Sequence, residues 1–109
     1  MTQVFNWDGL NAAADGDAEL FGRLGEAFVE SARETVAQLQ AALAPFERQA
    51  LGRAAHKLAG AAGLGGGGLL ARRLRSLELA ASTEAAPRLA ERVAEIGRLV
   101  AQAEQERPT

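Results

Sequence analysis

Two adjacent residues, His56 and Lys57, are the only histidine and the only lysine in the chain, and every other basic residue is an arginine. An imidazole titrates near neutral pH, so His56 is the one standard side chain here that can act at that pH as a neutral nitrogen nucleophile or a general base. The chain has no cysteine, which excludes disulfides and thiolate zinc sites. A single histidine also excludes a histidine-rich zinc site, so side-chain chemistry at neutral pH centres on His56.

The segment around His56 has the periodicity of an amphipathic helix. Apolar residues recur in steps of three and four across residues 46–62, and a helical wheel places His56 about 140° from the centre of their stripe. Gly52 and Gly60 share its side of the helix, although a glycine inside a helix costs about 1 kcal/mol relative to alanine. We therefore expect an exposed imidazole beside a bare patch that a bulky partner can approach, with an ordinary surface histidine as the alternative. The stripe consists of Leu51, Ala54, Ala55, Leu58 and Ala62.

Helices are expected along the rest of the chain as well, because Ala, Leu, Glu, Arg and Gln dominate and no alternating strand pattern occurs. Asp8 is expected to cap a short first helix, and Pro45 should end the long second one. Ser82 and Thr83 are cap candidates for the last helix, in which Pro87 is tolerated only in the first turn. The expected helices cover about residues 8–14, 17–44, 46–62 and 69–81, and the last begins at residues 84–87.

Each of the four longer helices carries one apolar stripe, which it cannot bury alone. Short connections favour an all-α fold, an antiparallel up-down four-helix bundle with a short additional N-terminal helix, as a single domain over residues 1–109. Phe5 and Trp7 are expected to cover one end of its core. We expect a monomer, and a homodimer whose stripes pair between chains is the alternative. The other stripes consist of Phe21, Leu24, Phe28, Ala32, Val36, Leu39 and Leu43, then Leu70, Leu74, Leu77 and Ala81, then Leu89, Val93, Ile96, Val100 and Ala103.

The composition argues against several classes of protein. The net charge of -2 disfavours nucleic acid as the main partner, since phosphate binding needs a basic excess. Residues 1–7 lack the features of a secretory signal, and the longest uncharged run, residues 58–71, is too short to span a bilayer. We therefore expect a cytoplasmic protein with no membrane segment. Gly63, Gly65 and Gly68 match the spacing of a dinucleotide-binding turn, but no strand precedes them, so a simple turn is the preferred interpretation.

The residues around His56 also form a family pattern. Residues 55–62 read AHKLAGAA and are followed by Gly66, Leu70 and the pair Leu77-Glu78. This pattern resembles the histidine-containing phosphotransfer (HPt) domain family, whose usual motif is His-x-Leu-Lys-Gly, followed by a loop glycine and a closing Leu-Glu. Similar segments at residues 5–8, 28–30 and 39–42 extend the resemblance over nearly the whole chain.

The resemblance implies a phosphocarrier of a two-component phosphorelay. His56, through Nε2 of a neutral imidazole, would accept a phosphoryl group from an aspartyl phosphate on a response-regulator receiver domain and pass it to another receiver. The implied partners are receiver domains or a hybrid histidine kinase, with no cofactor or metal on this chain and Mg²⁺ on the receiver. Such a carrier is modified and regenerated, so it is not an enzyme, and 109 residues leave no space for a kinase ATP-binding domain. The initial methionine and short termini favour a stand-alone protein over an excised domain.

The resemblance also assigns roles near His56 and shows one departure. Gly60 matches the family's close-approach glycine, and Glu78 matches a polar position that orients the imidazole. The usual lysine, three residues after the histidine, is replaced by Ala59. This departure keeps a second hypothesis open, a degenerate HPt-like helical module that binds receivers or other partners without transfer. The candidates for the missing phosphoryl cation are Arg53, one turn before His56, then Lys57 and, more weakly, Arg75.

Overall fold

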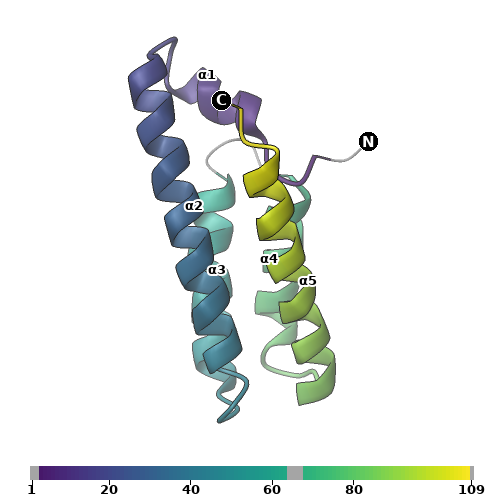
Figure 1. Cartoon of the computed structure of the whole chain (residues 1–109). Helices are drawn as coiled ribbons and strands as arrows, with labels where there is room; N and C mark the ends of the chain where they lie inside the picture. The colour runs from purple at the N-terminus through teal and green to yellow at the C-terminus, as the bar shows by residue number, and fades with distance from the viewer. Residues whose placement is uncertain (1–2, 64–67, 109) are drawn as a thin grey trace.

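The computed structural model describes residues 3–63 and 68–108. These residues form five helices and no strand: α1 (Trp7–Ala13), α2 (Ala18–Ala41), α3 (Arg48–Gly63), α4 (Leu69–Ala80) and α5 (Ala86–Gln105). Helices α2 and α4 each pack against both α3 and α5, and α1 packs against α2. Figure 1 shows the four longer helices running alternately up and down, with α1 across one end. The expected all-α four-helix bundle with a short N-terminal helix is confirmed.

The core consists mainly of the stripes that the periodicity predicted. Every predicted stripe residue on α3, on α5 and along α4 up to Ala81 is buried. On α2 the stripe is buried in part, because Phe28, Ala32 and Leu39 are enclosed and the other members are half-buried. Burial of a leucine side chain stabilises the fold by about 1.5–3 kcal/mol. The buried leucines on the inner faces of α3 and α4 therefore hold these two helices together. Helix α3 therefore forms a rigid support for the side chains on its outer face.

The first helix begins one residue earlier than expected and has a different cap. Asn6 is the N-cap of α1, and its Oδ1 accepts a hydrogen bond from the Gly9 amide at 2.9 Å. The expectation that Asp8 caps this helix is wrong, since Asp8 lies inside the first turn. Asp17 caps α2 by accepting from the Leu20 amide at 2.9 Å. Both caps satisfy amides that have no partner within the helix.

The connection between α2 and α3 is longer than the sequence suggested. Helix α2 ends at Ala41 and α3 begins at Arg48, so the predicted boundaries at 44 and 46 are wrong by two to three residues. Within the connection the Glu47 amide donates to the Ala42 carbonyl at 2.8 Å, and Leu43 pairs with Phe46 in an isolated bridge. These backbone bonds form a tight turn that holds the start of α3 against the end of α2.

The start of α5 needs no side-chain cap. Its N-cap is Ala85, with Pro87 in the first turn, so the predicted start is confirmed and Ser82 and Thr83 are not its caps. The turn before α5 is held instead by Arg48, which donates to the carbonyls of Ala81 and Glu84. Arg92 donates two hydrogen bonds to the Glu84 carboxylate and thereby holds the pKa of that carboxyl below its ordinary value.

The N-terminal segment closes the opposite end of the bundle. The carbonyls of Gln3 and Val4 accept hydrogen bonds from the amides of Leu69 and Leu70 at 2.7 and 2.9 Å, which gives partners to two amides in the first turn of α4. Trp7 and Phe5 are buried, as expected. The segment is thereby held against the first turn of α4.

Residues 64–67, which include Gly65 and the loop Gly66 of the family pattern, lie outside the described residues. A helix rather than a strand precedes these glycines, so the structure contradicts a dinucleotide-binding turn there. Across residues 3–63 and 68–108, no helix is long and apolar enough to cross a membrane.

Candidate functional site

His56 lies on the outer wall of the bundle. It is in the middle of α3, and its side chain is 75% exposed although the adjacent Ala55 is fully buried. The wheel argument is thus confirmed, because the imidazole points away from the stripe that packs into the core. A partner can reach the ring without any movement of the bundle.

Glu78 on α4 holds one nitrogen of this ring. The distance from His56 Nδ1 to Glu78 Oε2 is 2.8 Å, and the Glu78 side chain is 38% exposed. A carboxylate can only accept a hydrogen bond, so in the neutral imidazole this contact places the proton on Nδ1 and leaves the lone pair on Nε2. No described residue makes a hydrogen bond to Nε2. In its neutral form the ring therefore presents an oriented Nε2 lone pair to solvent.

A shallow hollow of about 610 Å³ lies against His56. It is lined by Gln49, Gly52, Arg53, His56 and Glu78. Arg53 makes no ion pair with any described residue, so its guanidinium is available to an anion that enters the hollow. Lys57 does not line this hollow. The described residues contain no group of His, Asp or Glu side chains that could hold a metal ion.

Gly60 leaves open space one turn after His56. Apart from the neighbouring backbone of its own helix, a Cβ atom placed on Gly60 would meet no atom within 4 Å, so the packing of the bundle does not require glycine there. Alanine would favour the helix by about 1 kcal/mol. Because glycine has no side chain, the outer surface beside the imidazole carries no side-chain atoms at this position.

Two other positions discussed from the sequence lie elsewhere. Ala59, where the family pattern has lysine, is 4% exposed and belongs to the core. The guanidinium of Arg75 lies beside Gly63, because a Cβ atom built on Gly63 would be 3.2 Å from Arg75 Nη2. Gly63 is seven residues after His56, which corresponds to about 10 Å along the helix axis. Of the three candidate cations, Arg53 is the one that the structure brings to the hollow at His56.

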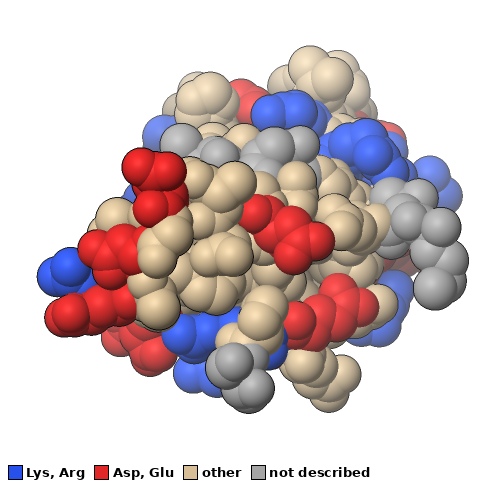
Figure 2. Space-filling view, turned by 90° about the horizontal axis from the view of Figure 1, so that it is seen from above, with Lys and Arg blue, Asp and Glu red and all other residues tan. Residues whose placement is uncertain are grey.

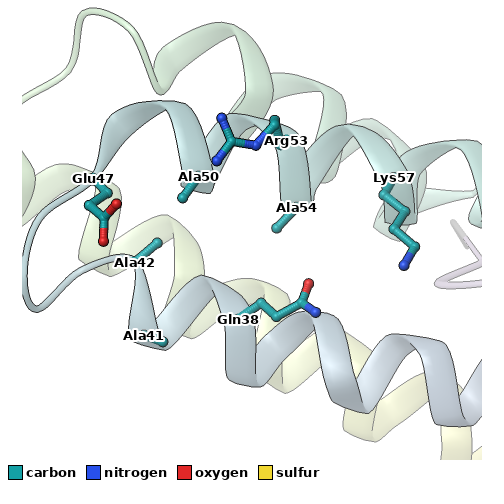
Figure 3. A pocket seen from close by; sticks show the side chains of 8 residues that line it. All are labelled: Gln38, Ala41, Ala42, Glu47, Ala50, Arg53, Ala54 and Lys57. Carbon is teal, nitrogen blue, oxygen red and sulfur yellow. The ribbon is translucent and has the colours of Figure 1, made fainter.

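A second hollow, which the sequence analysis missed, lies between α2 and α3 and has a volume of about 390 Å³ (Figure 3). Its sequence signal is the set of alanines near the end of α2 and the start of α3, which leave room between two helix surfaces. A single-helix wheel cannot show this, because the hollow exists only where both helices carry small residues. It is lined by Gln38, Ala41, Ala42, Glu47, Ala50, Arg53, Ala54 and Lys57.

Both the sequence and the fold can be compared with known proteins. Residues 23–106 match the family model of the Hpt domain. The fold is similar to the crystal structure of the HPT domain of an Hpt sensor hybrid histidine kinase from Shewanella, with a TM-score of 0.73, 23% identity, and coverage of 94% of this chain and 88% of that one. A search of curated proteins finds no match. Because the family model covers well over half of the sequence, the chain belongs to the Hpt domain family.

Proposed function

We propose that this chain is a histidine phosphotransfer protein of a two-component phosphorelay, with His56 as the phosphoacceptor. The observation that carries the proposal is the exposed imidazole with Nδ1 bonded to Glu78 and Nε2 facing solvent. Membership of the Hpt domain family supports the same chemistry. In this proposal the chain acts in the cytoplasm as a monomeric carrier and not as an enzyme, because it is consumed and regenerated in each transfer.

The proposed step conserves atoms and charge without a proton transfer. The Nε2 lone pair attacks the phosphorus of an aspartyl phosphate on a receiver domain, a nitrogen–phosphorus bond forms, and the phosphorus–oxygen bond to the aspartate breaks. The aspartate leaves as a carboxylate with the bonding electrons. The ring keeps its Nδ1 proton and becomes positive, and the adjacent Glu78 carboxylate stabilises that charge. Transfer to a second receiver reverses these bond changes, and Mg²⁺ held by the receiver neutralises phosphoryl charge.

In this proposal Arg53 supplies the cation that Ala59 cannot. It lines the hollow beside His56 and has no acidic partner among the described residues. Its exposed position allows the guanidinium to follow the phosphoryl oxygens from one donor to the next. Lys57 remains the second candidate for this role.

The direct test is incubation with a phosphorylated receiver. We expect the chain to acquire a label that is labile in acid and stable in alkali, and mass spectrometry should locate it on His56. A chain that binds the receiver but takes up no label would favour the degenerate module, for which Ala59 is the supporting observation.

Removal of Glu78 is expected to slow transfer. Glu78→Ala should lower the rate about tenfold, because both ring tautomers become populated and the positive charge on the phosphorylated ring loses its partner. Glu78→Gln, which keeps a hydrogen-bond acceptor but not the charge, should lie between the wild type and Glu78→Ala. Nitrogen chemical shifts of the imidazole report the tautomer independently of the rate. An unchanged tautomer in Glu78→Ala would remove Glu78 from the proposed mechanism.

Removal of Arg53 is expected to weaken stabilisation of the transferring group. Arg53→Ala should reduce the transfer rate about tenfold, which is less than for a donor in an enclosed site because solvent screens the exposed charge. Arg53→Lys should recover part of the rate. Arg98→Ala removes an exposed arginine from α5, and we expect it to leave the rate unchanged. Equal rates for Arg53→Ala and Arg98→Ala would exclude Arg53 as the cation.

Gly60→Ala should raise the stability of the fold and slow phosphoryl transfer. Its methyl group meets no atom beyond the neighbouring backbone of its own helix, so we expect the free energy of unfolding to rise by about 0.5–1 kcal/mol. Transfer from a receiver should fall about fivefold, because about 1 kcal/mol of docking is lost when the surface beside His56 is raised. Gly22→Ala on α2 adds a methyl group to equally open space and should be stabilising without slowing transfer. Chemical denaturation and transfer kinetics check both, and an unimpaired Gly60→Ala variant would contradict the access role.

A further inference from the structure

The two sides of the His56 ring along α3 have different surroundings. Toward the C-terminus of the helix, Ala59 is 4% exposed and packs into the core, and Lys57 extends toward α2 (Figure 3). Toward the N-terminus, the ring adjoins the hollow of about 610 Å³, to which α3 also contributes Gln49, Gly52 and Arg53. Open volume and a cation that lines it therefore occur together on the N-terminal side of the ring.

The direction of side chains in a helix favours the same side. The Cα–Cβ bond of a helical residue tilts toward the helix N-terminus, so a long side chain covers the turn that precedes its own Cα atom. The turn before His56 contains Gly52 and Arg53, four and three residues earlier. As this direction requires, the imidazole lines the hollow together with both residues. A group attached to Nε2 is thus directed toward the hollow.

Gly52 leaves room for such a group. A Cβ atom built on Gly52 would lie 3.7 Å from the Cβ atom of Ala81, which is an ordinary van der Waals contact. Packing between α3 and α4 therefore does not require glycine at this position, although alanine would favour the helix by about 1 kcal/mol. The effect of the glycine is to leave the hollow beside the ring without side-chain atoms.

Arg53 supplies positive charge that the chain does not neutralise with an ion pair. Five arginines elsewhere are each paired with a glutamate, and Figure 2 shows basic and acidic side chains interspersed at the α1 end of the bundle. Glu47 lines the neighbouring hollow together with Arg53, but no ion pair joins them. The second carboxylate nearby, Glu78, is bonded to Nδ1 of the ring. An anion in the hollow thus meets an unpaired guanidinium and a carboxylate that the imidazole already engages.

We propose that the phosphoryl group carried by His56 occupies the hollow over Gly52, where its oxygens contact the Arg53 guanidinium. Gln49 lies in the same hollow, and its amide donates a hydrogen bond to a phosphoryl oxygen directly or through water. This inference rests on the proposed function and adds Gly52 and Gln49 to its site. It places the cation and the open space of this chain before the histidine, because Ala59 is buried after it.

Labelling by phosphoramidate tests the hollow without a receiver. Nε2 attacks the phosphorus of this small donor, and ammonia leaves with the electrons of the broken phosphorus–nitrogen bond. Gly52→Leu fills the hollow, and we expect it to slow labelling of His56 by about tenfold or more. Nitrogen chemical shifts should show an unchanged tautomer, so the loss reflects the missing room. Gly22→Leu adds the same side chain to open space on α2 and should be labelled at the wild-type rate.

Charge changes at Gln49 test the same hollow electrostatically. They are measured at about pH 8, where an ordinary imidazole is neutral. Gln49→Lys should raise the rate of labelling by phosphoramidate about threefold and Gln49→Glu should lower it by a similar factor, because solvent screens charges in an open hollow. The same changes at Gln40, which is exposed on α2 and lines neither hollow, should leave the rate unchanged. A purely structural role of Gln49 would not produce effects of opposite sign.

Two results would overturn the inference. One is a wild-type rate of labelling in Gly52→Leu, and the other is a pair of Gln49 variants with the same rates as the Gln40 pair. In both cases, transfer from a phosphorylated receiver to the wild-type chain would still support the proposed function. A wild-type chain that takes no label from either donor refutes the proposed function itself.

Discussion

His56→Gln is expected to abolish phosphoryl transfer, with a loss of about 10³-fold or more in the rate of labelling by a phosphorylated receiver. The amide of glutamine has no nucleophilic lone pair at nitrogen, and the chain contains no second imidazole that could replace it. Its amide can still donate a hydrogen bond to Glu78, so the surface around the site keeps its shape. The loss should therefore reflect the missing nucleophile alone.

The fold and the docking surface serve as internal controls for this variant. Because the His56 side chain is 75% exposed, the free energy of unfolding should change by no more than about 0.5 kcal/mol. The Kd for the receiver should stay within about threefold of the wild-type value, since most of the interface is unchanged. Retained acid-labile label on His56→Gln would place the phosphoacceptor elsewhere and would remove the central residue of the proposal.

The sequence was sufficient to predict which side of α3 is exposed. The leucines and alanines of its stripe repeat with the helical period, and the position of His56 outside the stripe follows from that period alone. The same argument gave the buried faces of α4 and α5, because each helix is long enough to show several repeats. The pairing of His56 with Glu78 needed the family resemblance, because the two residues lie 22 positions apart on different helices.

Other features depend on details that a helical wheel does not contain. The N-cap of α1 is the side chain that directly precedes the first helical turn, which is Asn6 and not Asp8. The two candidates are only two residues apart. Ala59 lies at the edge of the stripe by angle, and it is buried because α4 packs against that side of α3. The hollow between α2 and α3 depends on the separation of these two helices, which follows from packing in three dimensions.

Trp7→Ala is expected to lower the free energy of unfolding by about 3–5 kcal/mol. Trp7 is 5% exposed, and its Nε1 donates a hydrogen bond to the Ala103 carbonyl at 2.9 Å. The Trp7 ring packs edge-on against the rings of Phe5 and Phe28, with distances of 4.7 and 6.0 Å between ring centroids. The truncation leaves a cavity where α1, α2 and α5 meet and a buried carbonyl without its donor. Trp7 lies outside the residues that match the family model, so this chain closes its bundle with a residue that precedes the matched region.

This loss is measured by urea denaturation followed by far-ultraviolet circular dichroism. Fluorescence is unsuitable, because Trp7 is the only tryptophan and the chain has no tyrosine, so Trp7→Ala removes the fluorescent probe. Trp7→Phe keeps an aromatic ring but not the indole donor, so we expect a smaller decrease than for Trp7→Ala. Leu79→Ala, at a side chain that is 79% exposed, should change stability by no more than about 0.5 kcal/mol. If Trp7→Ala and Leu79→Ala were equally stable, the indole of Trp7 would not hold α1 against α2 and α5, and the closure of the bundle would have to come from other residues.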